Sequence, residues 1–425
     1  MNSRRRFLIA GAGGIAAGVA GCGGGSDAAL DGLPQPAAIT PPLVAAAPAP
    51  APVPSPAPAP APQPPISLSG GSTRPLGTQT LGAFLVGVRT ALPEGIMSAN
   101  SRMLLPSGQL SYCGAVIWRD KYSLGVSGGH ADSYDDGHYA QDLRTGNWEM
   151  LLPPSTQGTP SHAADAYGEW LPGRPAAQHS GYHQVTVDDD IVLAYSYSIG
   201  YMGSGSGQAH RWNGAAGAWE RYGNLRTAAP IVHTAIHDKR RNRIVLFEAQ
   251  TTSKVHVIAA KNPVASWSSI GMRSFSTAGL YQSVGYHAAL DCFVLVDQHT
   301  AANRVWVMDP DAIANGWVEV AVHGSAPTPM TWAGLEYVPP LQLFVSANVA
   351  EADALYYLAP KAGRFDSWAW YRESFTGPSA AWESSRGTPN SPQTRVKWSQ
   401  LLNGLVIAKS PLALTEIFTP SGLAR

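Results

Sequence analysis

A repeated phrase that ends in tryptophan limits what this chain can fold into more than any other feature. It reads TGNWEML, AGAWERY, VASWSSI, ANGWVEV and FDSWAWY, around Trp148, Trp219, Trp267, Trp317 and Trp368. The last three intervals are 48, 50 and 51 residues. A second marker, an aromatic residue or histidine followed by a turn and an apolar strand, is led by His237, His287 and Tyr337, which are 50 residues apart. Two markers with one period predict a β-sheet repeat of about 50 residues with four short strands per unit.

The stretch from 111 to 151 carries the repeat in its fullest form. It contains WRDKYSLGVSGG and then GHYAQDLRTGNW, with Gly128 and Gly129 after a strand and DLRT shortly before Trp148. This stretch resembles a kelch repeat. By its period, the chain from about residue 80 to 425 resembles kelch-type or galactose-oxidase-like β-propellers. The resemblance implies an all-β fold, a β-propeller of four-stranded kelch-like blades.

The markers divide the chain into six units, at residues 111–151, 179–222, 231–269, 281–320, 331–371 and 394–418. The sixth unit offers three strands. We therefore expect a strand near Phe84, in the run LGAFLVGVR at 81–89, to supply the fourth and close the ring. Six blades is the expected count and seven is the alternative. The repeated tryptophans are expected to pack between neighbouring blades.

The N-terminal 79 residues are expected to serve in export and anchoring and not to belong to the folded domain. SRRRFL at 3–8 matches a twin-arginine signal, and Val19-Ala20-Gly21 precedes Cys22 as in a lipoprotein cleavage box. We expect residues 1–22 to be a signal peptide and Cys22 to carry lipid, which anchors the protein in the bacterial cell envelope, in the periplasm or at the outer membrane. Residues 23–79, rich in Pro and Ala, predict a disordered linker that holds a folded domain at 80–425 away from the membrane.

The charge balance and the cysteine spacing argue against two classes of function, nucleic acid binding and zinc binding. Lys plus Arg equals Asp plus Glu, at 29 each, so there is no basic excess to favour a nucleic acid partner. Cys113 and Cys292 lie in strand-like runs and are expected to be two buried thiols, with a disulfide as the alternative. No cysteine spacing indicates zinc, and DSYDDGH at 132–138 is expected to be a solvated acidic turn rather than a calcium loop. We therefore expect a monomer without metal or cofactor.

Strand direction sorts the polar residues onto two faces. Loops between second and third strands, and crossovers between units, open on one face, while turns between first and second strands open on the other. On the crossover face we expect an axial mouth with His130, His179, Tyr182 and His233 as acid or base groups. The candidate substrate-binding residues there are Arg395, Asn348, Trp332, Tyr281, Gln298 and His299. His237 and His287 belong to turns of the opposite face, and His256 to strand packing.

Histidine, tyrosine and arginine together suit β-elimination from a uronate polysaccharide. A cation or amide neutralises the sugar carboxylate, His or Tyr removes the C5 proton, and Tyr or His protonates the leaving oxygen. Propeller-fold polysaccharide lyases resemble this chain in architecture and residue types. The sequence therefore predicts an exported propeller acting on a polysaccharide or oligosaccharide, with the membrane contacted through the lipid only. The alternative is a non-catalytic module that binds glycan or protein.

Overall fold

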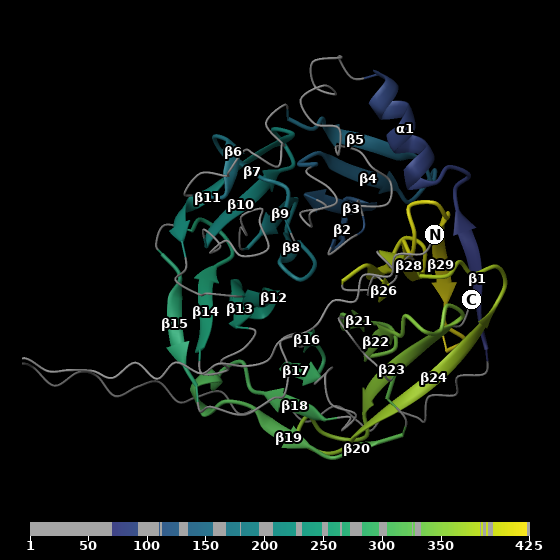
Figure 1. The fold of residues 1–425 in the computed structure, drawn as a ribbon. Coiled ribbons are helices and arrows are strands. Elements are labelled where there is room, and N and C mark those ends of the chain that lie inside the picture. Colours follow the sequence, from purple (N-terminus) through teal and green to yellow (C-terminus); the bar gives the residue numbers. More distant parts are fainter. Residues whose placement is uncertain are drawn as a thin grey trace, which may run out of the picture. The chain divides into compact units, whose positions relative to one another are not determined.

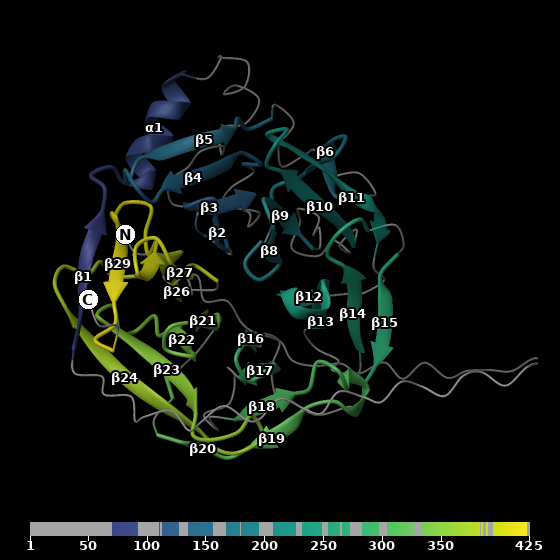
Figure 2. The same cartoon turned by 180° about the vertical axis from the view of Figure 1, so that it is seen from behind.

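Antiparallel sheets of four strands make up most of the part of the chain that the structure describes (Figures 1 and 2). All of the described residues lie within Ala59–Arg425, which forms one compact unit. The structure is a computed structural model, and it describes residues 70–91, 110, 113–126, 135–155, 167–178, 180–194, 207–226, 232–248, 254–263, 266–272, 283–296, 304–324, 326–327, 333–382, 384–385, 388–389 and 394–422.

Four of the sheets are simple meanders in which consecutive strands are hydrogen-bonded neighbours. The first contains β2 (Val116–Trp118), β3 (Lys121–Val126), β4 (His138–Asp142) and β5 (Trp148–Leu152). The second contains β8 (Gln184–Val187), β9 (Asp190–Leu193), β10 (Gln208–Asn213) and β11 (Ala218–Arg226). The third contains β12 (Val232–Asp238), β13 (Arg243–Glu248), β14 (Lys254–Ala259) and β15 (Ser268–Gly271). The fourth contains β16 (Ser283–His287), β17 (Cys292–Val296), β18 (Val305–Met308) and β19 (Val318–Val320).

A larger sheet joins two further meanders through an N-terminal strand. One meander is β21 (Glu336–Val338), β22 (Leu343–Ala347), β23 (Ala354–Pro360) and β24 (Trp368–Thr376), with β20 (Val322–His323) paired to β24. The other is β27 (Val396–Ser399), β28 (Gly404–Ile407) and β29 (Thr415–Thr419). Strand β1 (Gly71–Leu76) runs antiparallel to β29 and parallel to β24, and so lies between the two meanders.

Short elements complete the described part. Two small hairpins are β6 (Glu169–Leu171) with β7 (Arg174–Pro175), and β25 (Ser384–Ser385) with β26 (Thr388–Pro389). The 3₁₀ turns are η1 (Lys239–Arg241) and η2 (Ile313–Asn315), and the α-helix is α1 (Leu81–Ala91). Within the described residues, no helix has the length and apolar character needed to span a membrane.

The expected closing strand near Phe84 is wrong, because residues 81–91 form α1. Leu81, Phe84, Leu85 and Val88 recur at the helical period and pack on the first sheet, where Leu81 and Leu85 are buried. Thr80 caps the helix, since its Oγ1 accepts from the Ala83 N–H at 3.1 Å. The fourth strand beside β29 comes from residues 71–76, which sequence analysis had placed in the linker.

The first strands of the meanders contact one another in succession. β2 contacts β8, β8 contacts β12, β12 contacts β16, β16 contacts β21, β21 contacts β27, and β27 contacts β2. This arrangement of small sheets is propeller-like, and the first strands can be followed in Figures 1 and 2, with β27 labelled in Figure 2. All-β architecture with a propeller-like arrangement is therefore confirmed.

Burial decreases from the second strand of a sheet to the outer strand. The second strands β17, β22 and β28 are buried at every position, whereas every residue of β15 keeps some exposure. Second strands read as continuous apolar runs because both faces of each sheet pack against neighbouring sheets. Trp219 and Trp368 lie in such packing between sheets, as predicted. Cys113 and Cys292 are buried free thiols.

Every described turn between a first and a second strand contains a non-glycine residue with positive φ. These residues are Asp120, Asp188, Asn242, Asp291, Gln342 and Asn403, with φ between 45° and 58°. Asp and Asn tolerate this left-handed conformation better than other residues with a Cβ. The repeated tight turn fixes the spacing of first and second strands. It also places His237 and His287 at the ends of β12 and β16, on the face predicted for them.

Candidate functional site

Part of the predicted axial mouth falls within the described residues. Tyr182, Asn348 and Arg395 are described with their side chains. His233 lies in β12, but its side chain is outside the described part. The other candidate residues and the lipidation site lie outside the described residues, namely His130, His179, Trp332, Tyr281, Gln298, His299 and Cys22.

Arg395 directly precedes β27 and is fully buried. Its Nη1 donates to the carbonyl of Ala408, at the end of β28, over 2.9 Å. Its own carbonyl accepts a 2.7 Å hydrogen bond from the Tyr122 hydroxyl on β3. Burial raises the pKa of the Tyr122 phenol, so that this group stays a neutral donor. Arg395 therefore connects the C-terminal meander to the first sheet.

Lys409 follows β28 and is a second buried cation at the same end of the meander. Its ammonium lies 2.8 Å from Oε2 of Glu416 and also donates to the Ala352 carbonyl. Burial lowers the pKa of Lys409, and the Glu416 carboxylate opposes this shift. The Lys409 ammonium and the Arg395 guanidinium lie 5.8 and 5.5 Å from the ring centroid of Trp382, so that one indole contacts two cations.

Asn348 shapes the turn that reaches Lys409. It follows β22, and its side chain is buried. Its Oδ1 accepts from the Ala350 N–H at 3.0 Å, and its carbonyl accepts from the Glu351 N–H at 3.1 Å. The turn held in this way presents the Ala352 carbonyl to Lys409. The structure thus brings two predicted residues, Asn348 and Arg395, to the same neighbourhood.

Tyr182 adjoins this neighbourhood through its backbone. The Thr394 hydroxyl donates to the carbonyl of Gly181, so the segment with Tyr182 lies beside the segment with Arg395. A Cβ on Gly114 would lie 2.5 Å from both the Gly181 carbonyl and the Thr394 Oγ1, and this close approach therefore requires glycine. The Tyr182 carbonyl accepts from Ala235 N–H of β12 at 2.9 Å. We call Tyr182, Asn348, Arg395 and Lys409 the crossover-end cluster.

The acidic loop departs from its sequence interpretation as a solvated turn. Asp135 and Asp136 are fully buried. Asp136 accepts from the Ser155 N–H and hydroxyl, both at 2.7 Å, and pairs with the Arg174 Nε at 2.9 Å. Asp135 accepts from the Tyr139 hydroxyl at 2.9 Å. Asp136 anchors the end of the loop to the segment that follows β5, and its partners Ser155 and Arg174 are too distant in sequence to be inferred from the loop alone.

Sequence reasoning missed Trp382 and Glu416. Trp382 lies outside the repeated tryptophan phrase, and that departure was the signal that could have singled it out. Glu416 lies in β29 and also accepts from the Ser379 hydroxyl at 3.2 Å. Across the described ranges, no group of three or more His, Cys, Asp or Glu side chains is arranged to hold a metal ion.

A cavity of about 380 Å³ opens on the opposite face, between the second and third sheets. It is lined by Thr186, Asp188, His237, Lys239, Asn242 and Lys261. His237 donates from Nδ1 to the Thr186 carbonyl at 2.7 Å, and burial lowers its pKa. His287 donates from Nε2 to the Gln342 carbonyl at 2.9 Å and accepts from the Leu290 N–H at 3.2 Å. Both histidines hold turns in place, as predicted.

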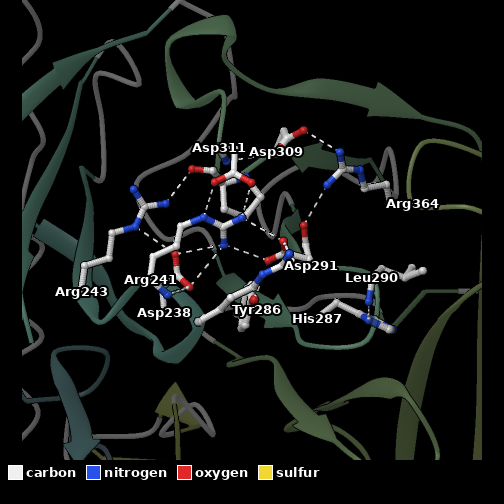
Figure 3. A network of polar contacts seen from close by, with 12 residues as sticks. Asp238, Arg241, Arg243, Tyr286, His287, Leu290, Asp291, Asp309, Asp311 and Arg364 are labelled. Carbon is white, nitrogen blue, oxygen red and sulfur yellow. Dashed lines mark hydrogen bonds and ion pairs between the residues drawn. The ribbon is translucent and has the colours of Figure 1, made fainter. Parts of the chain in front are cut away.

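The same face carries an ion-pair network across the third, fourth and fifth sheets (Figure 3). Arg241 lies at its centre and pairs with Asp238, Asp291 and Asp311. Arg364 extends the network from beyond β23, since it pairs with Asp309 and donates to the Asp291 carbonyl. Arg241 and Arg364 each pair with a carboxylate of a neighbouring sheet, which makes the network a connection between sheets.

Comparisons with known proteins do not assign this chain to a family. No protein-family model and no curated protein matches this chain. Among solved structures, it is similar to a structural-genomics protein of unknown function from Bacteroides thetaiotaomicron, with 12% identity, 82% of this chain and 76% of that chain covered, and a TM-score of 0.45. It is also similar to YjhT, with 12% identity over 76% of this chain and 97% of that chain, and a TM-score of 0.42. TolB from Acinetobacter baumannii shares 14% identity over 55% of this chain and 51% of its own, with a TM-score of 0.32.

Proposed function

We propose that the chain is an exported, lipid-anchored, kelch-like propeller of six blades that acts on an acidic extracellular glycan. The six-blade count is supported by the contact succession of β2, β8, β12, β16, β21 and β27, which returns to its start. It is also supported by the positive-φ turn that recurs between first and second strands. In this proposal β1 serves as the outer strand of the last blade.

One observation carries the proposed ligand class. Two buried cations, Arg395 and Lys409, flank Trp382 at the end where crossovers between sheets lie. Buried cations are weakly screened by solvent, and their field extends to the nearby surface. Lys409 pairs with Glu416, and the Arg395 guanidinium donates to the Ala408 carbonyl. This field favours a ligand that carries carboxylates, and a uronate polymer fits that description.

A lyase reaction is the catalytic form of this proposal. The basic neighbourhood would neutralise the uronate carboxylate, a histidine would take the C5 proton, and Tyr182 would act as acid or base. We expect the absorbance of an unsaturated uronate product to rise with at least one acidic polysaccharide. His130→Ala and His179→Ala should each lower the rate by ~100-fold or more. Because a histidine base must be neutral, the rate should rise with pH through about 6.5.

The matched control is His323→Ala, because His323 is the exposed residue of the short strand β20. This variant should keep both the activity and the melting temperature. A second candidate is a non-catalytic glycan-binding module, since Arg395 and Asn348 are 0% and 2% exposed and bond to backbone groups, which keeps both side chains from contacting a reacting atom. Binding on a glycan array that is lost in the His130 and His179 variants, without any product, would establish that candidate. If neither activity nor binding responds, the assignment of the crossover face is wrong.

The proposed lipid anchor has its own test. Cys22→Ala should move the protein from the membrane fraction to the soluble fraction of the cell envelope, because no acyl chain can then be attached. The measurement is detergent-free fractionation followed by immunoblotting. Cys113→Ala serves as the control, since this thiol is buried in the fold. An unchanged membrane fraction in Cys22→Ala would refute the anchor.

A further inference from the structure

Three side chains on consecutive strands of the third sheet form one hydrogen-bonded chain. Glu248 ends β13, His256 lies in β14, and Ser269 lies in β15. His256 Nε2 lies 2.9 Å from Glu248 Oε1, and His256 Nδ1 lies 2.9 Å from Ser269 Oγ. The last contact follows from strand register, because His256 and Ser269 are directly paired across β14 and β15.

The donors and acceptors in this chain have one consistent order. A carboxylate only accepts, so the imidazole proton lies on Nε2 and points to Glu248. Nδ1 then carries a lone pair and accepts the Ser269 hydroxyl proton. Glu248 and His256 are 8% and 4% exposed, whereas Ser269 is exposed. The chain therefore runs from a buried carboxylate through a buried imidazole to a hydroxyl at the surface.

We propose that Ser269 is a nucleophile for acyl transfer, with His256 as its general base and Glu248 as the positioning residue. A serine hydroxyl becomes nucleophilic when an adjacent base takes its proton and a third group orients that base. Ser269 Oγ attacks the carbonyl carbon of an ester while its proton passes to Nδ1. The ester C–O bond then breaks, and the leaving alcohol takes that proton. Water, activated in the same way, releases the acid and restores the serine.

The position of Ser269 selects the class of substrate. β15 is the outer strand of its sheet, and an outer strand has backbone N–H groups that point away from its neighbour. Such groups are the donors that a developing oxyanion requires. An exposed serine on an outer strand can reach an ester that projects from an extended polymer. The substrate class is therefore an O-acyl ester on a polymer, and the site is separate from the crossover-end cluster.

The test is covalent labelling with a fluorophosphonate probe, read by mass spectrometry of the modified peptide. We expect Ser269 to be labelled in the otherwise unchanged protein and labelling to disappear in Ser269→Ala. Ser268 provides a matched control on the same strand, because its hydroxyl donates to the Val257 carbonyl at 3.1 Å rather than to an imidazole. Ser268→Ala should therefore be labelled at the same rate as the parent protein.

Variants of the two supporting residues test their separate roles. His256→Gln should slow labelling by ~100-fold or more, as expected for loss of a general base. Glu248→Gln should slow it at least ~10-fold, because a carboxamide can donate to Nε2 and favour the wrong tautomer. Glu248→Asp, which keeps a carboxylate acceptor for the imidazole, should recover part of that rate. If Glu248 only stabilises the fold, the folded Glu248→Gln protein would be labelled at the parent rate.

Hydrolysis of p-nitrophenyl acetate and release of acetate from an acetylated polysaccharide complete the experiment. Both rates should fall in Ser269→Ala and stay constant in Ser268→Ala. Ser269 is exposed, so its variant should keep the parent melting temperature even if His256→Gln does not. The proposal fails if the folded parent protein shows no label at Ser269, or if Ser268 and Ser269 are labelled alike.

Discussion

Removal of residues 1–77 should lower the melting temperature by roughly 10 °C or more, whereas removal of residues 1–69 should leave it unchanged. The difference between the two proteins is β1. Residues Ser72–Leu76 pair with Thr415–Thr419 of β29, and Gly71 and Ser72 pair with β24. Without β1, both β24 and β29 lose a hydrogen-bonded neighbour, and β29 becomes a sheet edge.

The size of the effect follows from what β1 buries. Leu76 is 4% exposed and packs with the first sheet, and burial of such a side chain contributes about 1.5–3 kcal/mol. Thr73 Oγ1 donates to the Pro378 carbonyl at 2.8 Å, and each net hydrogen bond adds about 1 kcal/mol. Together with the backbone hydrogen bonds between β1 and β29, these contacts correspond to a loss of ~5 kcal/mol in the free energy of unfolding.

Both truncated proteins keep α1, so the comparison isolates the strand. Differential scanning calorimetry should show one transition for the protein that starts at residue 70 and a lower or broader one for the protein that starts at residue 78. Equal melting temperatures would show that β1 does not stabilise the fold.

The sequence predicts the repeating part of this fold well because its markers are local. A tryptophan phrase recurs in five of the six predicted units and a tight turn in all six, and the predicted units overlap the observed meanders. The closing strand is different. GSTRPL contains one proline and little alternation, and it forms a strand because β29, more than 300 residues away, offers a partner. A pairing partner so distant leaves no trace in the local pattern.

The candidate site shows the same division. Strand direction correctly sorted His237 and His287 to turns, because alternation of strands depends only on their order. It could not reveal that Arg395 is fully buried or that Asp136 is held by Arg174, since both depend on contacts between distant segments. The bonds from His256 to Glu248 and Ser269 also escaped the sequence, because cross-strand register fixes them.

Arg241→Met should destabilise the fold by about 3–5 kcal/mol, since it removes the buried cation that three carboxylates share. In Figure 3, Arg241 is surrounded by three aspartates. Asp238 is fully buried and Asp291 has 15% side-chain exposure, so water cannot replace the lost guanidinium at either. Arg243 still pairs with Asp238 at 2.9 Å and limits the loss there. The measurement is the free energy of unfolding from urea titration at neutral pH.

Arg240→Met is the matched control, because Arg240 pairs with the same Asp291 from an exposed position, with 68% side-chain exposure. An exposed pair contributes about 0–1 kcal/mol, so this variant should be close to the parent protein. If the two variants lose equal stability, burial is not what gives Arg241 its importance.

Acid titration gives an independent measurement of the same network. The hydrogen bonds from Arg241, aided by the Tyr286 hydroxyl, lower the pKa of Asp291 from 3.8 to about 2. A carboxylate with a lowered pKa in the folded state stabilises the protein above its unfolded pKa and loses that contribution as pH falls through the folded value. As pH falls from 4 to 2, protonation of Asp291 should therefore lower the free energy of unfolding of the parent protein by roughly 2 kcal/mol. In Arg241→Met this loss of stability should be smaller, because the folded pKa of Asp291 returns toward its unfolded value. If the variant and the parent lose equal stability between pH 4 and 2, Arg241 is not the cause of the lowered pKa of Asp291.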